Sequence, residues 1–105
     1  MGLFGRKKPQ GTPMKELSGF DGKRLSYVVE RRGADEQVIG REGGITVDET
    51  GGKLTIVCNG TPVADMKLEG LVCAELMSRN GCDIKGTDTT GVRRHLVAHY
   101  SSLRD

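Results

Sequence analysis

The stretch of this chain with the most potential for chemistry is GVRRHLVAHY, residues 91–100, where two histidines follow two adjacent arginines. Guanidinium and imidazole groups bind anions, and paired histidines can also bind a metal ion. If the stretch is a strand, alternation places Arg93, His95 and His99 on the face opposite its apolar residues. These three side chains form the candidate anion-binding strip. A solvated strand face is the more common meaning of such a pattern and needs no ligand.

A metal ion shared by His95 and His99 is not predicted. Four residues along an extended strand separate two Cα atoms by about 13 Å, at ~3.3 Å per residue. The H-x-x-x-H pattern instead needs a helical turn to bring its side chains together. The three cysteines, Cys58, Cys73 and Cys82, form no C-x-x-C pair. We therefore expect no metal site and no cofactor. No residue is identified as catalytic, which leaves the question of enzymatic activity open.

The positive charge of the chain is concentrated at its start. The formal net charge is +2, and three of the 16 basic residues, Arg6, Lys7 and Lys8, lie in the first twelve residues, which contain no acid. The rest of the chain contains all 14 acids and is slightly acidic. Nucleic-acid-binding domains usually carry a basic face, and aromatic residues for base stacking make up only 4% here. The composition therefore does not favour a nucleic-acid partner.

Residues 1–13 are predicted to be a flexible basic leader, and residues 14–105 a single small β domain. At ~1 kcal/mol per cation near an anionic surface, the leader would bind a membrane only weakly. An inert, solubilising tail is the alternative. The residues of this predicted membrane-surface contact are Leu3, Phe4, Arg6, Lys7 and Lys8.

Cysteine usage and hydropathy predict a cytoplasmic protein, peripheral at the inner membrane surface if the leader binds lipid. The cysteine count is odd, and no apolar signal segment opens the chain. No apolar run approaches the ~18 residues that span a membrane.

The fold class is predicted to be mainly β, as an antiparallel meander. Apolar residues recur with period two in residues 24–30, 44–49 and 53–59. Asn-Gly is the strongest short signal for a hairpin turn, and strands joined by short turns are antiparallel. The predicted turns are residues 50–52, 59–60, 80–81 and 86–91, and Arg31-Arg32 is expected at another hairpin end.

Two strand assignments remain ambiguous. Residues 68–81 have helical spacing as well as a strand pattern; a strand ending at an Asn80-Gly81 turn is preferred, which places Met77 opposite Ile84. A two-residue turn at residues 59–60 places Leu54 opposite Asp65, with the apolar residues of the next strand on the wrong face. Either a β-bulge or a strand covered on both faces would reconcile this pattern.

Residues 43–100 resemble bacterial pleckstrin-homology-like domains of the PH and GRAM type. The run GGITVDETGGKLTIVCNGTPVADMKLEGLVCAELM would supply successive strands, and GCDIKGTDTTGVRRHLVAHY the closing hairpin. The resemblance implies a small PH-like open barrel or roll that binds peptides, lipids or other subunits without catalysis. The family's closing C-terminal helix has no counterpart here. Either residues 14–20, a candidate helical turn, or a partner must then cover the opening.

The sequence thus predicts a non-enzymatic cytoplasmic binding or assembly module. A protein is the favoured partner, and a homo-oligomer is also compatible with the sequence. One alternative is a small enzyme or anion-ligand-binding domain that uses the strip from Arg93 to His99. A further alternative is a small nucleic-acid-binding β-barrel.

Overall fold

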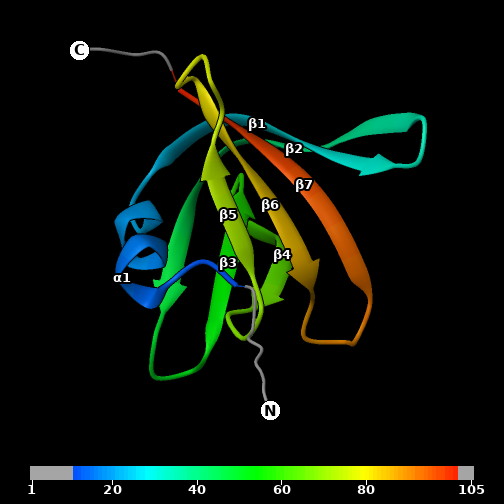
Figure 1. The fold of residues 1–105 in the computed structure, drawn as a ribbon. Helices are drawn as coiled ribbons and strands as arrows, with labels where there is room; N and C mark the ends of the chain where they lie inside the picture. The colour runs from blue at the N-terminus through cyan, green and yellow to red at the C-terminus, as the bar shows by residue number, and fades with distance from the viewer. Residues whose placement is uncertain (1–10, 102–105) are drawn as a thin grey trace.

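A seven-stranded antiparallel sheet forms the body of the computed structural model, which describes residues 11–101 (Figure 1). The strand order is β4-β3-β2-β1-β7-β6-β5, so two meanders, β1 to β4 and β5 to β7, join where β1 pairs with β7. The prediction of a mainly β, antiparallel fold is confirmed. The elements are α1 (Met14–Leu17), the 3-10 turn η1 (Ser18–Phe20), β1 (Arg24–Arg32), β2 (Asp35–Asp48), β3 (Lys53–Cys58), β4 (Thr61–Lys67), β5 (Val72–Glu75), β6 (Gly81–Thr87) and β7 (Arg93–Tyr100).

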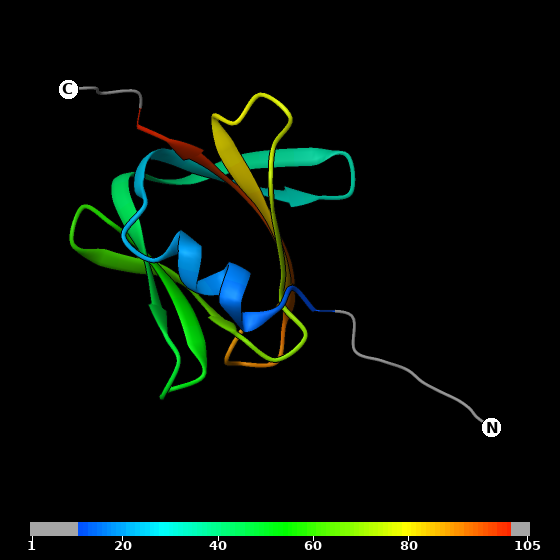
Figure 2. The same cartoon turned by 60° about the vertical axis from the view of Figure 1, so that its left-hand side comes forward.

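The sheet curls into an open roll around one apolar core, and α1 with η1 lies across its opening (Figure 2). Leu17 and Phe20 are buried in the same cluster as the strand residues. The segment before the helix is attached to β5: the Thr12 amide donates to Leu71 O at 2.8 Å, and its hydroxyl bonds both backbone groups of Cys73. Of the two closures that the sequence leaves open, the structure therefore has residues 14–20 over the core. No helix within residues 11–101 is long and apolar enough to cross a membrane.

The turn between β3 and β4 has the predicted two residues, Asn59 and Gly60, with φ of 53° and 77°. Positive φ at both positions is the requirement of a type I′ turn. The ladder then shifts register, because Val57 pairs with Pro62 but Ile56 pairs with Ala64. Of the two explanations that the sequence leaves open, the structure therefore has the β-bulge.

The bulge decides which side chains of β4 enter the core. The extra residue is Val63, and it turns Ala64 and Met66 to the same face as Leu54 and Ile56. All four of these side chains are buried. Without the bulge, Asp65 would face the core in place of Met66.

The segment around β5 is a strand, as preferred, but its predicted turn is wrong. The last β5 residue pairs with Cys82, and the chain returns through a wider loop in which Arg79 has the positive φ, 63°. Ile84 therefore pairs with Cys73 instead of Met77, whose side chain is fully exposed. β5 ends at Glu75 because the loop between it and β6 is longer than the predicted two-residue turn.

Strands β1 and β2 extend beyond the sheet as a two-stranded arm (Figure 1). β7 pairs with β1 only as far as Glu30, and β3 pairs with β2 only from Gly43 onward. Arg32 pairs with Asp35 across a two-residue turn in which Gly33 has φ of 62°. The hairpin end predicted at Arg31-Arg32 is therefore confirmed, and β1 diverges from β7 just before it.

Candidate anion-binding groove

A concave groove of about 440 Å³ lies where the arm diverges from β7. Its lining comes from the end of β1, the middle of β6 and the start of β7. Five of the lining residues are arginine or lysine, and one is an acid. The basic groove, as we call it, is lined by Glu30, Arg31, Arg32, Lys85, Val92, Arg93, Arg94 and His95.

Strand register brings these residues together. His95 pairs with Lys85 of β6, and the next residue of β7 pairs with Glu30 of β1. Alternation along β7 directs Leu96 and Ala98 into the core, where both are fully buried. It directs Arg93 and His95 outward, as the sequence predicts.

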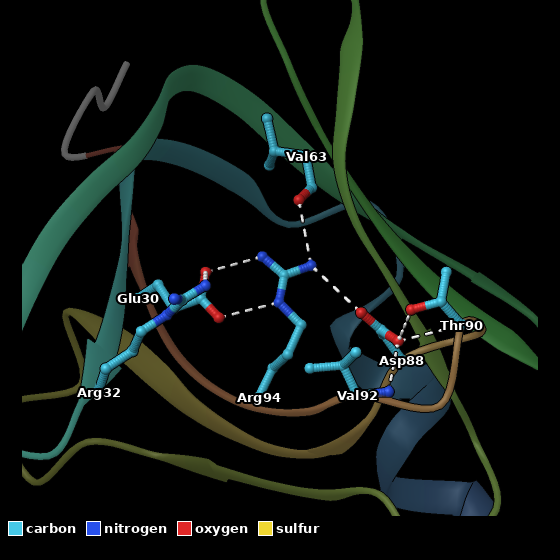
Figure 3. Close-up of polar contacts among 7 residues, drawn as sticks. All are labelled: Glu30, Arg32, Val63, Asp88, Thr90, Val92 and Arg94. Atoms are coloured by element: carbon cyan, nitrogen blue, oxygen red, sulfur yellow. Dashed lines mark hydrogen bonds and ion pairs between the residues drawn. The ribbon is translucent and has the colours of Figure 1, made fainter.

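The acid in the groove is neutralised by an ion pair (Figure 3). The Arg94 guanidinium donates from Nε to Glu30 Oε2 and from Nη2 to Oε1, both at 2.9 Å. This bidentate hydrogen bonding lowers the pKa of Glu30 and raises the pKa of Arg94, although burial opposes both shifts. Glu30 therefore stays ionised and paired, and its charge does not add an uncompensated negative site to the groove.

Asp88 organises the loop that leads into the groove. Its Oδ1 accepts hydrogen bonds from the Thr90 hydroxyl at 2.6 Å, the Thr90 amide at 2.9 Å and the Val92 amide at 3.0 Å. The Thr90 hydroxyl is the main reason that the pKa of Asp88 is lowered, followed by the Val92 amide. Asp88 Oδ2 also lies 3.7 Å from Arg94 Nη1 (Figure 3). The loop wall of the groove is thus held by one carboxylate.

Arg94 and this loop also connect the edge strand β4 to β7, on the opposite side of the roll. Arg94 Nη1 donates to the Val63 carbonyl of β4 at 3.4 Å, and the Thr89 amide donates to the Asp65 carbonyl at 2.9 Å. The free edge of β4 is therefore bonded to residues next to the groove. The floor of the groove is part of the seam that holds the roll together.

The other cations of the groove are more available for a ligand. Arg31 pairs with Glu36 at 3.0 Å, with both side chains about half exposed, and Arg32 lies 3.9 Å from Glu30. Lys85 and Arg93 are exposed and make no ion pair with any acid among residues 11–101. These two side chains can give their full hydrogen-bonding capacity to a bound anion.

Of the two histidines of the predicted strip, only His95 lies in the basic groove. His95 lines the groove and contacts Asp83 through Nε2 and Oδ1. His99 lies further along β7 and stacks on Tyr27 of β1, with ring centroids 4.3 Å apart and planes inclined by 14°. Within residues 11–101, no group of three or more His, Cys, Asp or Glu side chains is placed to hold a metal ion.

The groove is better suited to holding an anion than to breaking a bond. The contact with Asp83 orients the His95 imidazole, but the lining contains no hydroxyl or thiol that this ring could activate. Glu30 is occupied by Arg94 and is not a free base. The arrangement offers positive charge and the hydrogen-bond donors of Lys85 and Arg93.

The sequence indicates only part of this groove. Alternation identifies Arg93 and His95, whereas no local pattern identifies Lys85 and Arg94, because their role depends on the pairing of β7 with β6 and β1. The predicted membrane-contact residues lie outside the described part of the chain, and their role stays a prediction; they are Leu3, Phe4, Arg6, Lys7 and Lys8.

No family model matches this chain, and neither a curated protein nor a solved structure matches it. The resemblance of residues 43–100 to pleckstrin-homology-like domains therefore stays a prediction.

Proposed function

We propose that this protein is a non-catalytic binding module whose basic groove holds a ligand with clustered negative charge. The observation that carries this proposal is the lining of the groove, in which five arginine or lysine residues surround one paired acid. The body of the protein is close to neutral, so this concentration of cations is local. A concave site focuses such a potential onto a ligand.

The groove is preorganised on one side and adaptable on the other. Arg94 is fixed by its bonds to Glu30 and Val63, so it keeps its position when the groove is empty. Lys85 and Arg93 are exposed and can adjust to the ligand. Arginine binds carboxylate or phosphate oxygens in a two-point geometry, and lysine binds them as a point charge.

Binding of inorganic tripolyphosphate, measured by calorimetry, tests the charge of the groove alone. The double variant Lys85→Gln, Arg93→Gln should bind about tenfold more weakly or worse, because two hydrogen bonds to a charged ligand are removed. The matched control is Lys15→Gln, which removes an exposed cation on α1, outside the groove. Equal affinity of the double variant and the wild type would contradict the proposal.

A further inference from the structure

The stacked rings of Tyr27 and His99 form a second feature on the two strands that build the groove. The two residues are direct partners in the pairing of β1 with β7. Their planes are nearly parallel, with 4.3 Å between centroids, and both rings line a cavity at the end of β7 remote from the groove. Both rings are partly exposed, so this pair is not part of the core.

The surface beside His99 is open toward β6. The β6 residue that pairs with His99 is Gly81, which has no side chain to cover the ring. A Cβ atom there would lie 2.3 Å from the Ala98 carbonyl oxygen, so this position requires glycine. A cavity of about 410 Å³ adjoins the rings, with Arg79 and Asn80 in its lining. A planar group could enter it and meet both a ring and polar side chains.

The rings and the outward-facing groove residues Arg93 and His95 lie along one face of β7. His95 and His99 have the same parity in a strand whose pairing with β6 has no register shift. Their Cα atoms are therefore about 13 Å apart, at ~3.3 Å per residue. Val97 lies between them, with its β1 partner Val29 and its β6 partner Asp83, whose carboxylate contacts His95. One extended ligand can contact the cations at one end and the rings at the other.

We infer that the ligand of this face is a single-stranded nucleic acid, with phosphates in the basic groove and a base stacked on Tyr27 and His99. The inference rests on the proposed function, since the groove supplies the charge. Proteins that bind single strands combine a basic groove along the backbone with aromatic rings that stack on bases. In a duplex, neighbouring bases already cover each other's faces, so a single strand fits the exposed rings better.

The rings favour a nucleic acid over an acidic peptide. A peptide rich in Asp and Glu would satisfy the groove equally well, but it would leave the stacked rings without a matching group. Asn80 can exchange two hydrogen bonds with a base edge, and Arg79 can pair with a phosphate. The near-neutral composition of the body does not oppose this, because the exposed cations Lys85 and Arg93 lie together in the groove.

The first experiment uses the full chain and three probes of matched charge in a fluorescence anisotropy titration. The probes are oligodeoxythymidine, an abasic phosphodiester strand of equal length, and polyglutamate. We expect oligodeoxythymidine to bind on the order of tenfold to 100-fold more tightly than the abasic strand, the difference that stacking of a base provides. Affinity for both strands should fall as salt increases, because bound phosphates release counterions.

Variants then assign each part of the affinity. His99→Leu and Tyr27→Leu should remove most of the preference for bases and leave the abasic strand unaffected, whereas Tyr27→Phe should retain the preference. The double variant Lys85→Gln, Arg93→Gln should weaken both strands, and Lys15→Gln neither. Circular dichroism of each variant checks its fold. The three probes can also be compared on the wild-type protein alone. That comparison tests the inference even if a ring substitution unfolds the chain.

The possible results separate this inference from the proposed function. Equal binding of the abasic and base-bearing strands would overturn the nucleic-acid inference but leave an anion-binding groove. Tighter binding of polyglutamate than of either strand would assign the groove to an acidic protein segment. Binding of none of the probes, together with no binding of tripolyphosphate, would overturn both proposals.

Discussion

Arg94 and Glu30 form a two-point ion pair across β7 and β1, with both donor–acceptor distances at 2.9 Å. The two side chains expose only 17% and 8% of their surface. Because the same guanidinium reaches Val63 on β4 and Asp88 before β7, one side chain links the edge strand β4 to β1 and β7 across the roll. The pair therefore serves the fold and the groove together.

Replacing Arg94 should destabilise the protein strongly. Arg94→Met leaves the Glu30 carboxylate buried without its partner, and we expect a loss of about 3 kcal/mol in the free energy of unfolding. Urea denaturation followed by circular dichroism measures this loss. Arg31→Met is the control: its ion pair with Glu36 is about half exposed, so less than about 1 kcal/mol should be lost. Similar losses in the two variants would show that the pair does not hold the seam.

The same pair should make stability depend on acidity. The pKa of Glu30 is lowered in the folded state, mainly by its hydrogen bonds from Arg94, so the unfolded state binds the proton more readily. The stabilisation is complete above the pKa of an unfolded glutamate, about 4.3, and is lost as pH falls through the lower folded value. Asp88, whose pKa is also lowered, adds to this loss. Urea midpoints should decrease steadily between about pH 5 and pH 3.

Glu30→Gln tests the origin of this pH dependence. The variant should be less stable than the wild type at neutral pH, and its stability should change less as the solution is acidified. An equally steep profile in Glu30→Gln would assign the acid sensitivity to other carboxyl groups.

Local backbone requirements explain which parts of the fold could be predicted. The turn at Asn59-Gly60 is visible in the sequence because both residues tolerate positive φ, and the structure places both there. The alternation of β4 conflicts with that of β3, and this local pattern indicates either a bulge or a strand covered on both faces; the structure has the bulge. The Asn80-Gly81 turn was wrong because a wider loop, with Arg79 at positive φ, competes for the same connection.

The groove could not be predicted in the same way because it depends on distant pairing. Glu30 and Arg94 are 64 residues apart, and nothing near either residue indicates the other. The two side chains meet only if β1 pairs with β7, and that pairing depends on the curvature of the whole sheet. Alternation along β7 identified the outward Arg93 and His95, but the cations that face them come from strands whose register the sequence does not show.

The three cysteines should be unreactive until the protein unfolds. All three are free and buried, and burial raises the pKa of Cys73 to about 12 and of Cys82 to about 11. The thiolate, which is the reactive form, is therefore scarce at pH 8, and a reagent cannot reach the sulfur. Ellman's reagent should detect no thiol rapidly in buffer and all three in urea. Rapid reaction of one thiol in buffer would show that its strand opens easily.

The tight approach of β2 to β3 at Gly43 should make this glycine intolerant of any side chain. A Cβ atom at Gly43 would lie 1.8 Å from the Val57 carbonyl oxygen and 2.8 Å from the Cys58 Cα, which are backbone atoms that cannot rotate away. Gly43→Ala must therefore separate β3 from β2 and break the ladder from Gly43 to Asp48. We expect the free energy of unfolding to fall by more than about 3 kcal/mol, in the range of severe overpacking.

Gly19→Ala is the matched control, because a Cβ there meets no atom within 4 Å and φ is not positive. The stability of this variant should stay within about 1 kcal/mol of the wild type. Urea denaturation compares both variants, and a Gly43→Ala protein as stable as Gly19→Ala would mean that the two strands are further apart than the structure has them.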